Sequence, residues 1–121
     1  MRAQWVVDEV DYAKAKAILP QGLEANEASS PAMHGVTFIS ITQQGISKGS
    51  AVKDLCEYLK VDPKSTMGVG DSTGDEPMLK AVAHARVMAN SPTILKECYI
   101  SIGDVADCGV VEALQEALKL A

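Results

Sequence analysis

Short apolar runs alternate with helical patterns from residue 37 to residue 120, and this alternation limits the possible folds most. The runs are too short for helices and are followed by turn residues, which is typical of strands. Because strand–helix–strand repeats favour a parallel sheet, we expect an α/β fold with helices on both faces of the sheet. The strands are expected at 37–42, 66–70, 86–90 and 99–102, and the helices at 47–60, 75–85, 91–98 and 109–120.

Three of the expected helices carry apolar stripes at helical spacing, and we expect the stripe of the helix at 109–120 to face inward. In the helix at 75–85 the stripe consists of Met78, Leu79, Val82 and Ala83. In the helix at 47–60 the stripe consists of Val52, Leu55, Cys56 and Leu59. In the helix at 109–120 it consists of Val111, Leu114 and Leu118.

The first third of the chain is patterned differently. Residues 5–10 are compatible with a strand, and residues 11–19 with a short helix that Pro20 and Gly22 end. Residues 23–36 are polar and weakly patterned, so we expect turns there and no regular element. We place a domain boundary at the glycine turn after residue 44, which divides the chain into segments 1–44 and 45–121.

Composition excludes several classes of protein. Hydrophobic residues make up 47% of the chain, which is too many for a disordered tail. Lys and Arg number 11 against 16 Asp and Glu, so no basic surplus exists to bind nucleic acid. The sequence contains no apolar run of membrane-spanning length and does not begin with a signal peptide pattern. We therefore expect neither a nucleic-acid nor a membrane partner.

The three cysteines, Cys56, Cys98 and Cys108, show no spacing typical of metal ligands. We expect them to be small buried side chains in a reducing compartment, which indicates a cytoplasmic protein.

The segment "GVGDSTGDEPML" places Asp71 and Asp75 in a glycine-rich turn directly after an expected strand. In open α/β sheets, ligands bind beyond the carboxyl ends of the strands. Two carboxylates in one tight turn offer oxygen ligands of the kind that Mg²⁺ prefers. The same residues are also good turn and helix-capping residues, so the spacing alone leaves both interpretations open.

Lys48 lies in "GISKGS", just before an expected helix. The amino end of a helix prefers anions, so a cation placed there can share a bound anion with the helix. A solvated surface lysine is the alternative.

Three segments in order, "GISKGSAVKDLCEYLKV", "MGVGDSTGDEPMLKAV" and "VMANS", closely resemble the haloacid dehalogenase (HAD) superfamily. The branch that the chain resembles is the Cof-type sugar-phosphate phosphatases. The resemblance extends over about residues 36–118 and implies Mg²⁺-dependent hydrolysis of a small phosphorylated metabolite. It implies that Lys48 neutralises the phosphate and the nucleophile, and that Asp71 ligates Mg²⁺. Asp75 would support the metal directly or through water, and Asn90 would line the phosphate site.

The same resemblance implies that residues 1–44 are the remnant of an α+β cap domain. Residues 45–121 would be the C-terminal part of a HAD-like Rossmannoid core, with Gly45 and Ile46 as the hinge. The sequence departs from the family pattern at four positions, of which Gly74 is the most important because the family usually has a loop-bracing asparagine there. The others are Ala89, His84 and Cys108.

One part of the family pattern is absent. The D-x-D-G-T/S motif, whose first aspartate attacks phosphorus, does not occur in the sequence. We therefore expect the chain to be inactive alone, with no nucleophile of its own. In the family the nucleophile strand lies beside the strand that ends at Asp71, so residues 66–70 should form an exposed apolar edge. This edge predicts a homo-oligomer or association with a missing N-terminal segment.

Two other functions stay open at this stage. One is a non-catalytic remnant that serves as a binding or assembly module. The other is an unrelated doubly wound domain that binds a phosphate-bearing ligand.

Overall fold

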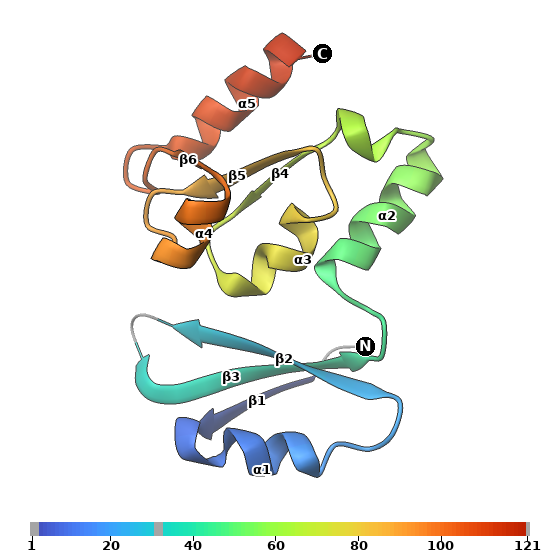
Figure 1. The fold of residues 1–121 in the computed structure, drawn as a ribbon, viewed down its shortest axis with the longest axis vertical. Coiled ribbons are helices and arrows are strands. Elements are labelled where there is room, and N and C mark those ends of the chain that lie inside the picture. Colours follow the sequence, from blue (N-terminus) through green and yellow to red (C-terminus); the bar gives the residue numbers. More distant parts are fainter. Residues whose placement is uncertain (1–2, 31–32, 121) are drawn as a thin grey trace. The chain divides into compact units, whose positions relative to one another are not determined.

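The computed structural model describes residues 3–30 and 33–120. The chain divides into two compact units, Met1–Ile46 and Ser47–Ala121 (Figure 1). The division lies two residues beyond the boundary that the sequence indicates, and Gly45 has the positive φ of 80° that its turn requires.

The first unit is an antiparallel sheet with strand order β1-β3-β2 and a helix against it. Its elements are β1 (Ala3–Asp8), the 3-10 turn η1 (Glu9–Asp11), α1 (Tyr12–Ala17), β2 (Leu23–Ser30) and β3 (Met33–Gln43). The core of this unit contains Ala15 from α1 and Ile39 and Ile41 from β3. Trp5 and Val7 from β1 pack against the same core, because alternate residues of a strand share one face.

The expectation of turns over residues 23–36 was wrong, since β2 occupies much of this range. Glu24, Ala25 and Asn26 pair with Thr42, Ile41 and Ser40 of β3. Only Ala25 of these three β2 residues packs against the core, so the strand lacks the apolar alternation that identifies a strand in a sequence. Pairing with β3 therefore decides its conformation, and intrinsic preference does not.

The second unit contains a parallel sheet with strand order β4-β5-β6, which confirms the predicted α/β fold. The strands are β4 (Met67–Gly70), β5 (His84–Met88) and β6 (Ile100–Ile102). The helices and 3-10 turns are α2 (Lys48–Leu59), η2 (Pro63–Ser65), η3 (Thr73–Asp75), α3 (Glu76–Leu79), α4 (Thr93–Cys98) and α5 (Gly109–Leu120).

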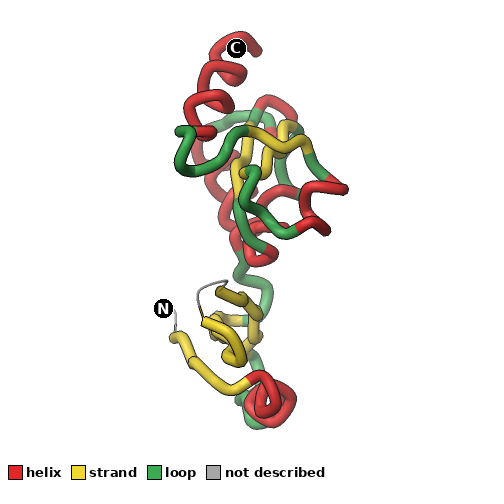
Figure 2. The backbone as a smooth tube through the Cα atoms, turned by 90° about the vertical axis from the view of Figure 1, so that its left-hand side faces the viewer, coloured by secondary structure: helices red, strands yellow, loops and turns green. Residues whose placement is uncertain are grey.

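Helices lie on both sides of this sheet (Figure 2). Leu79 of α3 and Leu95 of α4 pack with Val87 of β5 on one face. Ala113 of α5 packs with Met88 of β5 and Ile102 of β6 on the other face. The alternation of β5 side chains between the two clusters explains why the strands are apolar along their whole length.

The helix expected at 75–85 is shorter than predicted. α3 ends at Leu79, and β5 begins at His84. The backbone N–H groups of Ala83 and His84 donate to the carbonyls of Pro63 and Thr66, at 3.3 and 3.1 Å. Ala83 and His84 therefore bond to the segment just before β4 and do not continue α3. Strand pairing overrides the helical pattern that continues in the sequence.

The apolar stripe of α5 is not buried in full, contrary to our expectation, and the stripe of α2 is also largely exposed. In α2 only Cys56 of the predicted stripe is buried, and Leu55 and Leu59 are more than half exposed. In α5 Leu114 and Leu118 are also more than half exposed. The cysteine prediction was correct for Cys56 and wrong for Cys98 and Cys108, which are exposed.

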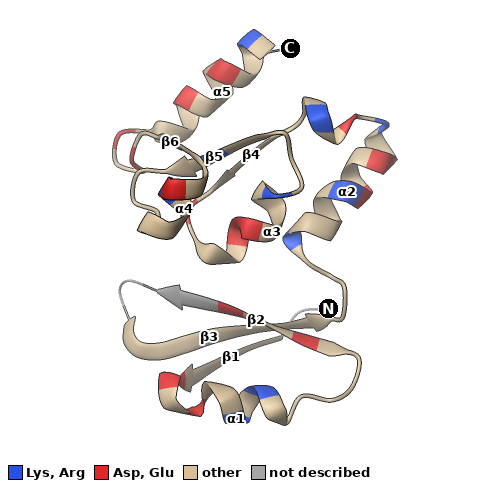
Figure 3. Ribbon diagram, viewed as in Figure 1, with Lys and Arg blue, Asp and Glu red and all other residues tan. Residues whose placement is uncertain are grey.

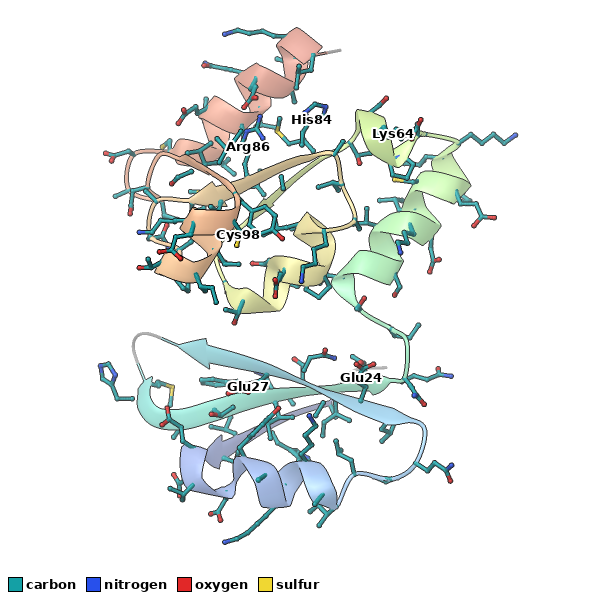
Figure 4. The ribbon with its side chains drawn as sticks, viewed as in Figure 1. Glu24, Glu27, Lys64, His84, Arg86 and Cys98 are labelled. Atoms are coloured by element: carbon teal, nitrogen blue, oxygen red, sulfur yellow. The ribbon has the colours of Figure 1, made fainter. Side chains whose placement is uncertain are left out.

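Charged side chains lie mostly on helices and turns (Figure 3), but Arg86 is buried in the middle of β5. Its guanidinium forms an ion pair with Glu116 of α5, and its Nε donates to Glu116 Oε2 at 2.8 Å (Figure 4). This pair connects α5 to the sheet, and no pattern in the sequence indicated it.

Candidate active site

The site lies where β4 ends and the loop Asp71–Asp75 turns back toward α3. Gly70 is required at this point, because a Cβ atom there would lie 2.6 Å from the Cβ atom of Asp75. The close approach of Gly70 and Asp75 folds the loop tightly. It therefore holds Asp71 and Asp75 at the carboxyl end of β4, the end at which open α/β sheets bind ligands.

Asp75 is the centre of this loop, and its carboxylate is buried, with the residue 6% exposed. Its Oδ2 atom accepts three hydrogen bonds, from the N–H of Asp71 at 3.0 Å and from the N–H and Oγ of Ser72 at 3.1 Å each. Its Oδ1 atom forms an ion pair with Lys48 Nζ. Asp75 therefore closes the turn that precedes it, and it makes no side-chain cap to α3.

Two opposing effects act on the Asp75 carboxyl. Burial raises its pKa, but the hydrogen bond from Lys48 and those from Asp71 and Ser72 outweigh burial, so the pKa lies below its usual value. The carboxylate is thus ionised whenever the loop is folded at neutral pH.

Lys48 reaches Asp75 because α2 and α3 approach closely at their amino ends. Gly49 permits this approach, since a Cβ atom there would overlap the carbonyl of Pro77. Ser47 and Ser50 fix the start of α2 through reciprocal hydrogen bonds between each side chain and the other's backbone N–H. The Lys48 side chain stays 56% exposed, so its ammonium can meet a ligand from solvent while it contacts Asp75.

Asp71 differs from Asp75 in having a free carboxylate. Its residue is exposed, and its side chain has no hydrogen bond or ion pair within residues 3–30 and 33–120. An unpartnered carboxylate at the end of a parallel strand fits a role as a metal or phosphate-site ligand. Across the part of the chain that the structure describes, no three His, Cys, Asp or Glu side chains gather around a common point.

Asn90 follows β5 and is exposed at the same end of the sheet as Asp71. Within the described residues, hydrogen bonds or an ion pair join Lys48, Asp75 and the backbone of Asp71, and none joins Asn90 to them.

A mainly apolar cavity of about 560 Å³ adjoins the two aspartates. It was missed by sequence reasoning, because its wall comes from residues far apart in the chain. These are Val69, Gly70, Met88, Val105 and the start of α5 at 108–111. The sequence features that could have indicated this cavity are Gly103 and Gly109. Their backbones are in direct contact, which brings α5 onto the sheet.

Comparisons with known proteins identify the family of the chain. Residues 5–114 match the family described as haloacid dehalogenase-like hydrolase. A Streptococcus pyogenes serotype M6 protein with a phosphatase name is 35% identical over 81 residues, which cover 65% of this chain and 30% of that protein. A phosphoglycolate phosphatase of Methanobrevibacter smithii is 31% identical over 83 residues, which cover 64% of this chain and 34% of that protein.

Among solved structures, BT1666 of Bacteroides thetaiotaomicron, a phosphatase of the HAD superfamily, is 25% identical. The TM-score is 0.77, and the match covers 98% of this chain and 42% of BT1666. The chain thus spans about a third of the length of the curated relatives that it matches. The family match covers most of the chain, both its units included, and the resemblance predicted from its motifs is confirmed: the chain belongs to the haloacid dehalogenase-like hydrolases, in their Cof-type branch.

Proposed function

We propose that this chain is the C-terminal part of a Mg²⁺-dependent phosphatase that hydrolyses phosphomonoesters of a small metabolite. One observation supports this proposal above the others: a free Asp71 beside a Lys48–Asp75 pair at the carboxyl end of β4, in a member of this family. Residues 1–44 would be the cap remnant and 45–121 the part of the core that carries the site.

Each polar side chain has a separate role in this proposal. Asp71 would hold Mg²⁺, and the ion would share the negative charge of the phosphoryl group. Lys48 would neutralise the phosphate, because its ammonium is half exposed beside the loop. Asp75 would act by positioning, since its four contacts fix both Lys48 and the backbone that carries Asp71. Asn90 would contact the substrate from the neighbouring strand.

The chain alone would be almost inactive. It has no D-x-D motif to supply a nucleophile, and it offers one free carboxylate in the loop where an ion such as Mg²⁺ needs several oxygen ligands. We infer that a second polypeptide segment, corresponding to the part of the relatives that this chain does not match, completes the site beside β4.

The other partner expectations follow from the surface. Lys and Arg are interspersed with Asp and Glu along the helices (Figure 3), which disfavours a nucleic-acid partner. None of the described helices has the length and apolar character needed to cross a membrane. Three free cysteines support a cytoplasmic location.

The test is complementation. The chain is assayed for Mg²⁺-dependent release of phosphate from a panel of small phosphate monoesters, alone and joined to the unmatched N-terminal portion of the Methanobrevibacter smithii relative. We expect no turnover alone and measurable turnover when joined. Asp71→Asn should abolish that turnover, and Asp54→Asn, on the exposed surface of α2, should leave it unchanged. Turnover by the 121-residue chain alone that is lost in Asp71→Asn would contradict the claim of inactivity.

A second candidate is a non-catalytic binding or assembly module. The observation that favours it is the arrangement of the loop, in which protein donors occupy both oxygens of Asp75. Calorimetric titration with Mg²⁺ and with orthovanadate distinguishes the two candidates. Heat from either ligand that disappears in Asp71→Asn supports the phosphatase, and no heat from either supports the module.

A further inference from the structure

A second cavity, of about 390 Å³, lies at the amino ends of β4 and β5, the end of the sheet opposite the candidate active site. Met67 and His84 are the first residues of these two strands, they pair with each other, and both line the cavity. The rest of the wall comes from η2 and from the last turns of α5. β4 has four residues, so about 13 Å of strand separates this cavity from Asp71.

Three polar side chains line this cavity, and none of them has a polar partner. Within residues 3–30 and 33–120, the Lys64 ammonium, the Ser65 hydroxyl and the His84 imidazole form no hydrogen bond and no ion pair. Figure 4 shows Lys64 and His84 near this end of the strands. An ammonium can only donate hydrogen bonds, and a hydroxyl and an imidazole can each donate one as well. Such a set of donors fits a ligand that offers several acceptor oxygens, such as a carboxylate or a phosphate.

The charge around this cavity is positive, although the chain as a whole has a net charge of −5. Glu116 of α5 is close by, and its pKa is lowered chiefly by its hydrogen bond from Arg86 and to a smaller extent by the charges of His84 and Lys119. Both oxygens of Glu116 are bonded to Arg86, so the charge of this acid is already balanced. Lys64 and Lys119 have no ion pair among the described residues, and their charges therefore favour an anion here.

The remaining side chains of the cavity wall are apolar. They are Met67 of β4 and Ala117 and Leu120 of α5. The volume lies within the range of small-molecule sites, roughly 300–1,000 Å³, and such sites usually combine apolar walls with a few polar groups. The cavity therefore has room for an apolar body beside the anionic group.

We propose that this cavity is a second binding site, which takes a small organic anion with a carboxylate or phosphate group on an apolar body. The anionic group accepts hydrogen bonds from Lys64, Ser65 and His84, and the apolar body lies against Met67 and Ala117. His84 is one of the positions at which the sequence departs from the family pattern, so one donor of this site is not a family feature. The site does not depend on the proposed phosphatase activity.

The two histidines of the chain make the site directly observable. His84 lines the cavity, whereas His34 is exposed on β3 in the first unit. The NMR signals of both imidazoles are followed in the full chain at constant pH, during titration with benzoate, phenyl phosphate and benzyl alcohol. The two anions carry different charged groups on the same ring, and benzyl alcohol carries the ring without a charge. We expect a saturable shift of the His84 signal with at least one anion, and none with benzyl alcohol or at His34.

Four variants locate the bound anion. Lys64→Met should raise its dissociation constant about fivefold, because the variant removes the ammonium. Lys53→Met, on the exposed surface of α2, removes the same charge elsewhere and should leave the constant unchanged. Ala117→Leu should weaken binding at least as much as Lys64→Met, because the larger side chain fills the space for the apolar body. Asp71→Asn, in the candidate active site, should leave the response of His84 unchanged.

Several results would overturn the proposal. A His84 signal that saturates with neither anion, or that moves together with the His34 signal, would show that no specific site exists. Equal weakening by Lys64→Met and Lys53→Met would show a general effect of charge. Loss of the His84 response in Asp71→Asn would assign the anion to the candidate active site. None of these results bears on the phosphatase proposal, because its test measures turnover.

Discussion

Two of the ion pairs described in the second unit have one buried member, and these two pairs are built in opposite ways. In the Lys48–Asp75 pair the acid is buried and the base is half exposed. In the Arg86–Glu116 pair the base is buried, with its side chain 8% exposed, and the acid is 37% exposed. The cost of losing a partner depends on how many contacts the buried member keeps. Asp75 keeps three hydrogen bonds from its own loop without Lys48, whereas Arg86 without Glu116 keeps only its bond to the carbonyl of Ala85.

This difference separates the roles of the two pairs. Because Asp75 has three donors in its own loop, we expect the loop to depend little on Lys48, which leaves the lysine able to respond to a ligand. The Arg86–Glu116 pair has little support from neighbouring groups, so it acts as a structural link between β5 and α5. The variants below test this distinction, in order of expected effect.

Asp75→Ala should have the largest effect. It removes the acceptor for Lys48 and for three donors of the loop at once, and it leaves the part-buried N–H groups of Asp71 and Ser72 without this acceptor. We expect a loss of about 4 kcal/mol in the free energy of unfolding, measured by urea denaturation. A loss below about 1 kcal/mol would show that the loop does not depend on this carboxylate.

Glu116→Ala should have the second largest effect. Arg86 would stay buried with one hydrogen bond to Ala85, and its guanidinium cannot easily reach water from the middle of β5. We expect a loss of about 3 kcal/mol. The control is the double variant Arg86→Met/Glu116→Leu, which removes both charges and should recover most of the stability. If the double variant is less stable than Glu116→Ala, the ion pair itself stabilises the fold, beyond the cost of leaving Arg86 buried without a partner.

Lys48→Met should cost only about 1 kcal/mol, because Asp75 retains its three loop donors and the lysine is half exposed. Urea denaturation beside Glu116→Ala measures the contrast directly. Equal losses for the two variants would contradict the idea that Asp75 is held by its own loop.

The sequence predicted the second unit better than the first, for a physical reason. Apolar strands such as β5 and the turn after Gly70 are local patterns, and Lys48, Asp71 and Asp75 follow recognisable turns and helix starts. β2 has no such pattern, since Glu24 and Asn26 become strand residues only by pairing with β3. No spacing rule could show that Asp75 bonds to Lys48 and to its own loop, or that α2 and α5 keep apolar side chains exposed. These contacts and exposed side chains depend on which strands and helices lie side by side in the fold, and the sequence pattern does not show this.

The smallest expected effect is on the pH dependence of stability, and it distinguishes the two acids. The pKa values of Asp75 and of Glu116 are both lowered in the folded chain. For Asp75, burial raises the pKa, but the hydrogen bonds from Lys48 and the loop outweigh it. For Glu116, the main cause is the hydrogen bond from Arg86. A lowered pKa means that the unfolded chain binds more protons in acid, so stability is complete above the unfolded value and falls as pH drops through the folded value. We therefore expect Asp75 to contribute stability at neutral pH that is lost in acid, as the pH drops below the usual pKa of an aspartate and Asp75 is protonated. Asp75→Asn should flatten this part of the profile more than Glu116→Gln does, because Glu116 is the more exposed acid. A steeper profile in Asp75→Asn than in the wild type would show that other carboxylates govern stability in acid.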